Sequence, residues 1–140
     1  MPGPVAQRRI LRDVERVCNA ARELAEQGIY YIPDEANACF GTALLVGRPG
    51  TPYYGGFYFF SVVFPEDYPF EPLHVKSLTQ NGYTRFNPNL YVDGKVCLSI
   101  LNTWTGPQWS AVQTLESVLR VLMSSVLVAN PLANEPAYES

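Results

Sequence analysis

Four short segments rich in β-branched and aromatic residues follow one another in the first half of the chain, with no helical spacing between them. They cover residues 29–32, 39–46, 57–64 and 74–77, and Pro or Gly turn signals bound each one. Consecutive strands joined by short turns pair as antiparallel neighbours, whereas parallel strands need long crossovers that are usually helical. The pattern predicts a four-stranded antiparallel meander and argues against a nucleotide-binding fold of alternating strands and helices.

Helical spacing appears on both sides of this meander. At residues 5–27 apolar side chains recur every three or four positions, and Gly28 supplies a stop. The same spacing returns at residues 112–128 on more than one face, which predicts a central, buried helix. A chain of 140 residues with 47% hydrophobic content can bury one core. We therefore predict an α+β fold in a single domain that spans residues 1–140.

Three connections differ from these regular segments. Residues 47–56 read GRPGTPYYGG, a composition that predicts a hairpin turn. Residues 64–73 hold three prolines, which remove backbone donors and predict a rigid extended loop. Residues 80–110 form a much longer irregular stretch that contains Cys97, and long ordered loops in compact domains are usually functional. We expect the chemistry of the protein around this cysteine.

Charge and cysteine content exclude several classes of function. The formal net charge of −3 gives no basic field that would attract nucleic acid or an anionic membrane, so neither is expected as a partner. No apolar run approaches the ~20 residues that cross a bilayer. The cysteines match neither a disulfide framework nor a zinc site, which predicts a reducing compartment and no metal or other cofactor. We expect a soluble protein of the cytoplasm, with the nucleus as a second compartment.

Four motifs occur together in a characteristic order. They are YYGG at residues 53–56, FPEDYPFEP at residues 64–72, FNPNLYVDGKVCL at residues 86–98, and the segment that begins at Trp109. In order and spacing they resemble the ubiquitin-conjugating enzymes over nearly the whole chain. The resemblance implies the fold of that family: an N-terminal helix, a four-stranded meander, a long active-site loop and a central helix. The two C-terminal helices of many members are absent or truncated here, as in a domain of a longer protein or a short divergent member.

The family resemblance assigns the reaction to the long loop. Cys97 matches the cysteine that carries a ubiquitin-like protein as a thioester, and Asn89, eight positions earlier, matches the family asparagine. By resemblance Asn89 binds the oxyanion of the transfer step or holds the loop that does so. The family histidine is replaced by Asn87, as in a divergent branch with FNPN. Tyr91 is expected to flank the cleft, or else to be a half-buried aromatic.

Other roles follow from the resemblance in the same way. An acidic residue after the central helix helps to deprotonate the incoming lysine, and Glu135, or Asn134 as the fallback, occupies that region. Phe70, Ala111 and Val112 match the loops that contact a ligase. Arg8, Arg9 and Arg12 match the helix face that contacts the activating enzyme.

Each of these residues also has a structural interpretation. The charged face of residues 5–27, which holds the arginines together with Asp13, fits an ordinary solvated helix face. Phe70 fits a core aromatic, Asn89 a turn residue after Pro88, and Glu135 an exposed acid. Cys97 by itself fits a small buried side chain, and Cys18 and Cys39 are predicted to be core thiols.

The resemblance predicts a conjugating enzyme whose partners are ubiquitin or a ubiquitin-like modifier, an activating enzyme, a ligase and a substrate protein. A first alternative is a catalytically inactive variant of this fold that only binds ubiquitin or a partner. A second is a cysteine hydrolase that pairs Cys97 with His74, the only histidine in the chain.

Overall fold

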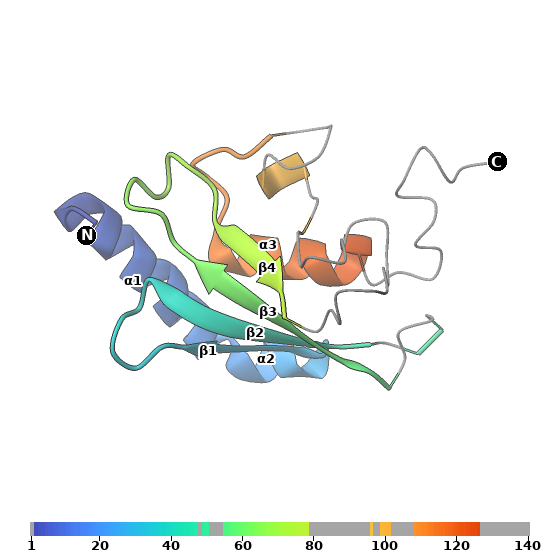
Figure 1. The fold of residues 1–140 in the computed structure, drawn as a ribbon. Coiled ribbons are helices and arrows are strands. Elements are labelled where there is room, and N and C mark those ends of the chain that lie inside the picture. Colours follow the sequence, from blue (N-terminus) through green and yellow to red (C-terminus); the bar gives the residue numbers. More distant parts are fainter. Residues whose placement is uncertain are drawn as a thin grey trace.

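A computed structural model of the chain describes residues 2–47, 49–50, 55–78, 96, 99–101 and 108–126. The strands β1 (Ile29–Pro33), β2 (Phe40–Val46), β3 (Phe57–Val63) and β4 (His74–Ser77) form one antiparallel sheet in sequence order. Figure 1 shows this sheet with helices on one of its faces. The predicted meander and the α+β class are confirmed. The Gly47 amide donates to the Gly56 carbonyl at 3.0 Å and so closes the connection between β2 and β3.

The two faces of the sheet differ in burial. The inward side chains of the central strands, Ala43, Leu45, Phe60 and Val62, are fully buried, at 0% exposure. Outward side chains such as Tyr30 and Phe57 remain exposed. This alternation follows the two-residue period of a strand, so one face builds the core.

The N-terminal helical segment is divided in two. Helix α1 (Pro4–Asn19) begins with Pro at its first turn, and α2 (Ala21–Glu26) follows after a break at Ala20. The single helix predicted for residues 5–27 is therefore wrong at this joint. The apolar spacing continues across the break, so periodicity could not reveal it. Gly28, with φ of 81°, ends α2 as expected.

The central helix begins later than its apolar spacing suggests. Helix α3 (Leu115–Val121) continues into a π-helical turn, η2 (Leu122–Val126), and its N-cap is Thr114. The Thr114 hydroxyl accepts from the Ser117 amide at 3.2 Å, and the Ser117 hydroxyl accepts from the Thr114 amide at 2.8 Å. This capping box places Val112 outside the helix. Leu115, Val118 and Leu119 are at 0% exposure, so the prediction of a buried helix is confirmed.

The proline-rich segment 64–73 is folded into turns and is not extended. The Tyr68 amide donates to the Pro65 carbonyl at 3.1 Å, and the Phe70 amide donates to the Asp67 carbonyl at 2.9 Å. The Tyr68 side chain is 1% exposed and packs edge-to-face on Phe64 at 4.9 Å between ring centroids. The extended conformation predicted from the prolines is wrong because the buried tyrosine draws the segment onto the core.

Candidate functional site

The proposed reaction centre lies outside the described residues. This applies to Cys97, Asn89, Asn87 and Tyr91, and equally to the candidates Glu135 and Asn134. Described residues on either side of Cys97 are anchored in the core. Val96 is 2% exposed, and Leu101, in the short helix η1 (Ser99–Leu101), is 5% exposed. Two buried residues, one immediately before Cys97 and one four positions after it, therefore flank the cysteine in the sequence.

The three residues that match ligase-contacting positions are all exposed. Phe70 is 75% exposed in the 64–73 segment, and Val112 is 84% exposed in the turn before α3, next to exposed Ala111. We call these three residues the docking surface; their contact with a ligase stays a prediction. The interpretation of Phe70 as a core aromatic is wrong, because Tyr68 fills the core from this segment.

The two segments that carry the docking surface are in direct contact. The Trp109 indole Nε1 donates to the Pro69 carbonyl at 2.7 Å, and the Trp109 and Tyr68 rings lie 5.8 Å apart. Figure 1 shows segments 64–73 and 108–114 at the same end of the molecule, beside α1. Residues about 40 positions apart in the sequence are thus joined by one hydrogen bond and one ring contact.

A buried polar cluster lies beneath these segments, and sequence reasoning missed it. Asp13 of α1 is 2% exposed and accepts a hydrogen bond from Arg9 Nε at 3.0 Å, another from the Tyr68 hydroxyl, and a third from the Leu115 amide at 3.2 Å. The Arg9 guanidinium also donates to the carbonyls of Ala111, at 2.8 Å, and Gln113. The only sequence signal was the four-residue spacing of Arg9 and Asp13, which also fits an exposed helix pair.

The arginines of α1 therefore fall into two groups. Arg8 and Arg12 are exposed, as expected for a helix face that meets a partner. The Arg9 side chain is 18% exposed and turns inward to Asp13, so the interpretation of a solvated face is wrong for these two residues. Arg9 serves the fold of this chain, and its contact with an activating enzyme stays a prediction.

Two groups near the docking surface have shifted pKa values. Burial, and then the hydrogen bond and charge of Asp13, raise the pKa of the Tyr68 phenol, so it remains a donor at physiological pH. The hydrogen bond and negative charge of Asp67 raise the pKa of the fully exposed Glu71 carboxyl. The buried Tyr68 phenol next to the docking surface therefore stays neutral, whereas the exposed Glu71 carboxyl next to Phe70 changes its charge with pH.

The remaining cysteines and the histidine lie elsewhere. Cys18 is exposed, so its prediction as a core thiol is wrong. Cys39 is partly buried and packs against the core. His74 is exposed at the start of β4, opposite Val63, and its pairing with Cys97 stays a hypothesis because Cys97 is outside the described residues.

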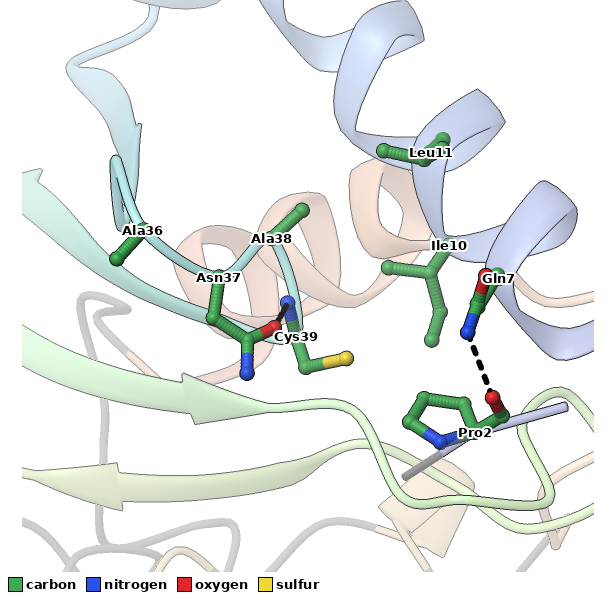
Figure 2. A pocket seen from close by; sticks show the side chains of 8 residues that line it. All are labelled: Pro2, Gln7, Ile10, Leu11, Ala36, Asn37, Ala38 and Cys39. Atoms are coloured by element: carbon green, nitrogen blue, oxygen red, sulfur yellow. Dashed lines mark hydrogen bonds between the residues drawn. The ribbon is translucent and has the colours of Figure 1, made fainter.

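A pocket of about 520 Å³ lies between the start of α1 and the turn that joins β1 to β2. Figure 2 shows its lining, which is formed by Pro2, Gln7, Ile10, Leu11, Ala36, Asn37, Ala38 and Cys39. Its only polar contacts between drawn residues are local: Gln7 to the Pro2 carbonyl, and the Cys39 amide to the Asn37 side chain. Among the described residues that line this pocket, none belongs to the docking surface.

The described part of the chain holds neither a cluster of metal-binding side chains nor a membrane-spanning helix. Within it, no three His, Cys, Asp or Glu side chains gather as a metal site would require. Over the same residues, no helix has the length and apolar character needed to span a membrane.

Known proteins match this chain along most of its length. The sequence model of a family described as ubiquitin-conjugating enzyme matches residues 9–140. Over 113 residues the chain is 49% identical to ubiquitin-conjugating enzyme E2 Z of Xenopus tropicalis. The match covers 80% of this chain and 36% of that protein. The Homo sapiens protein of the same name is 48% identical, with 32% of its length covered.

A third relative is far larger. The Homo sapiens protein named dual E2 ubiquitin-conjugating enzyme/E3 ubiquitin-protein ligase BIRC6 is 41% identical over an alignment of 137 residues. The match covers 94% of this chain and 3% of that protein. The chain thus spans about a third of the E2 Z relatives and a small part of this one. Since the family match covers nearly all residues and agrees with the observed meander and helix order, the chain belongs to the ubiquitin-conjugating enzyme family.

Proposed function

We propose that this chain accepts ubiquitin or a ubiquitin-like modifier from an activating enzyme as a thioester on Cys97 and transfers it to a substrate lysine with the help of a ligase. The observation that carries this proposal is the family match over residues 9–140, which includes Cys97 and Asn89. The exposed docking surface and the exposed Arg8 and Arg12 support it, since both are accessible to partner proteins.

The chemistry consists of two acyl transfers. First the Cys97 thiolate attacks the thioester carbonyl on the activating enzyme; a new carbon–sulfur bond forms and the activating-enzyme thiolate leaves. The two thioesters are similar in energy, so the modifier stays activated. A substrate amine then attacks the Cys97 thioester, an amide bond forms, and the Cys97 thiolate leaves.

Two residues assist the second transfer in this proposal. The attacking lysine must lose a proton, because its ordinary pKa near ~10.4 keeps it cationic at neutral pH. The Glu135 carboxylate accepts that proton and orients the amine; Asn134 is the fallback for this position and, as a neutral amide, could only orient it. Asn89 donates a hydrogen bond to the oxyanion, and loss of one such donor typically slows a transfer by about a hundredfold or more.

A charging assay tests the proposal. The chain is incubated with ATP, ubiquitin and activating enzymes, and the products are separated with and without a reducing agent. We expect an adduct that the reductant removes and that Cys97→Ala abolishes. Cys97→Ser should give an oxygen ester that resists the reductant, and the matched controls Cys18→Ala and Cys39→Ala should still form the thioester.

The opposite result has a defined meaning. If no activating enzyme charges the chain with ubiquitin or any related modifier, the inactive binding variant becomes the better assignment, and Asn87 is the first residue to revert to histidine. Hydrolysis of a ubiquitin ester that depends on both Cys97 and His74 would instead favour the cysteine hydrolase.

A further inference from the structure

The two segments of the docking surface share one buried anchor on a third element. Asp13 of α1 has three donors: Arg9 Nε at 3.0 Å, the Tyr68 hydroxyl, and the Leu115 amide at 3.2 Å. One donor belongs to segment 64–73 and another to the first residue of α3. A carboxylate with 2% exposure that receives three hydrogen bonds has its charge largely compensated.

Arg9 extends this anchor to the second segment. While its Nε holds Asp13, its terminal nitrogens donate to the carbonyls of Ala111, at 2.8 Å, and Gln113. These carbonyls lie on either side of Val112, and the guanidinium carbon lies 5.3 Å from the Tyr68 ring centre. A planar guanidinium with five N–H donors can bind these acceptors at once, whereas a lysine ammonium is a compact point charge.

The exposed docking residues lie very close to the buried ones along the chain. Tyr68 precedes Phe70 by two positions, and Val112 lies between the two residues whose carbonyls bind Arg9. The Trp109–Pro69 hydrogen bond of 2.7 Å closes the contact between the segments. Besides their local turn hydrogen bonds, the segments of Phe70 and Val112 therefore share one support, which consists of the side chains of Arg9, Asp13, Tyr68 and Trp109.

We propose that Arg9, Asp13 and Tyr68 are positioning residues that fix Phe70 and Val112 relative to each other and so preorganise the docking surface for a ligase. The ligase part of this inference rests on the proposed function, whereas the coupling of the two segments does not. A surface held in its bound arrangement loses less conformational entropy when a partner binds. A buried ion pair contributes little net stability compared with apolar packing, and a role in fixing one arrangement accounts for its presence here.

The first test needs no partner protein. Order parameters of backbone amides are measured by nitrogen-15 relaxation for the wild type, Arg9→Lys and Tyr68→Phe. Arg9→Lys keeps the positive charge but removes the planar guanidinium that binds several acceptors at once. Tyr68→Phe keeps the ring but removes one hydrogen-bond donor to Asp13. We expect both variants to lower the order parameters of the Phe70 and Val112 amides together, while the order parameters of the β2 and β3 amides stay unchanged. Arg16→Lys on the same helix and Tyr30→Phe on the exposed sheet face are the matched controls.

Two results would overturn the coupling. One is that Tyr68→Phe lowers order parameters only in segment 64–73 and leaves that of the Val112 amide unchanged. The other is that Arg9→Lys leaves both segments as rigid as in the wild type. If Tyr68→Phe fails to fold, Arg9→Lys alone still decides, because α1 is remote in sequence from both segments.

The second test measures the consequence for ligase binding. The probe is a ubiquitin ligase domain that speeds transfer from the charged wild type. Val112→Ala is expected to weaken binding of the ligase domain about tenfold when it is introduced into the wild type. Introduced into Tyr68→Phe, the same substitution should weaken binding clearly less, because a displaced Val112 contributes less to the contact. Strictly additive effects would reject preorganisation. Failure of Cys97 charging would reject the proposed function, while the relaxation experiment would still decide the coupling.

Discussion

Glu71 illustrates how a single residue near the docking surface can respond to pH. Its carboxyl is fully exposed, and the hydrogen bond to Asp67, followed by the negative charge of Asp67, raises the pKa of Glu71. A raised pKa means that the folded protein holds this proton more tightly than the unfolded chain does. The favourable contribution of Glu71 is therefore present at acidic pH and is lost as pH rises through its folded-state pKa.

We therefore expect Glu71→Gln to raise the midpoint of thermal unfolding at neutral pH. The gain should disappear as pH falls below about 4, where the carboxyl is protonated in both states, and it should shrink in high salt. Thermal unfolding of both proteins across this pH range measures the effect. Glu35→Gln in the exposed β1–β2 turn is the control, and an equal gain from that variant would contradict the role of Asp67.

Helix α3 shows how one element connects the core to the docking surface. Its buried residues Leu115, Val118 and Leu119 belong to the same core cluster as residues of the sheet and of α1, and its N-cap Thr114 lies two positions after Val112. The reciprocal bonds between Thr114 and Ser117 satisfy two backbone donors that the helix itself leaves unpaired. Helix α3 therefore begins where segment 108–114, which carries Ala111 and Val112, ends.

Thr114→Ala is expected to lower the free energy of unfolding by about 1 kcal/mol, because the hydroxyl no longer accepts from the Ser117 amide. Thr114→Ser retains that acceptor and should remain close to the wild type. Urea unfolding of the three proteins provides the measurement. If alanine and serine destabilise equally, the lost methyl group and not the cap accounts for the cost.

The whole molecule is a sheet with one covered face. Helices α1 and α3 and the segment 64–73 supply side chains to the inner face, whereas the outer face leaves Tyr30, Ile32 and Phe59 exposed. Burial is what makes an aliphatic side chain contribute to stability. Truncation of the same type of side chain should therefore cost much more stability on the inner face of the sheet than on the outer face.

Leu119 and Ile32 are isomeric side chains that allow this comparison. Leu119 is at 0% exposure, and Leu119→Ala should cost about 2–5 kcal/mol of unfolding free energy, because it leaves a cavity beneath the sheet. Ile32 is 72% exposed, and Ile32→Ala should change stability by about 0.5 kcal/mol or less. Comparable losses in a denaturant titration would show that the outer face is not solvent-exposed.

The sequence by itself determined the order of the strands and helices and the family. The meander was predictable because Pro and Gly punctuate each strand, and the two-residue and three-to-four-residue periods are local properties. The docking residues were named from motif positions, and the observed exposure of Phe70 and Val112 agrees with that role. Cys97, Asn89 and Glu135 were also named in this way and lie outside the described residues.

Only the tertiary structure decided which charged residues lie inside. Arg9 and Asp13 have the spacing of a surface ion pair, and nothing local distinguishes them from Arg8 and Arg12. Tyr68 and Leu115 come from segments 55 and 102 positions away from Asp13, and only the folded chain brings them together. Burial of a charge depends on these distant donors, so the sequence pattern could not predict the cluster beneath the docking surface.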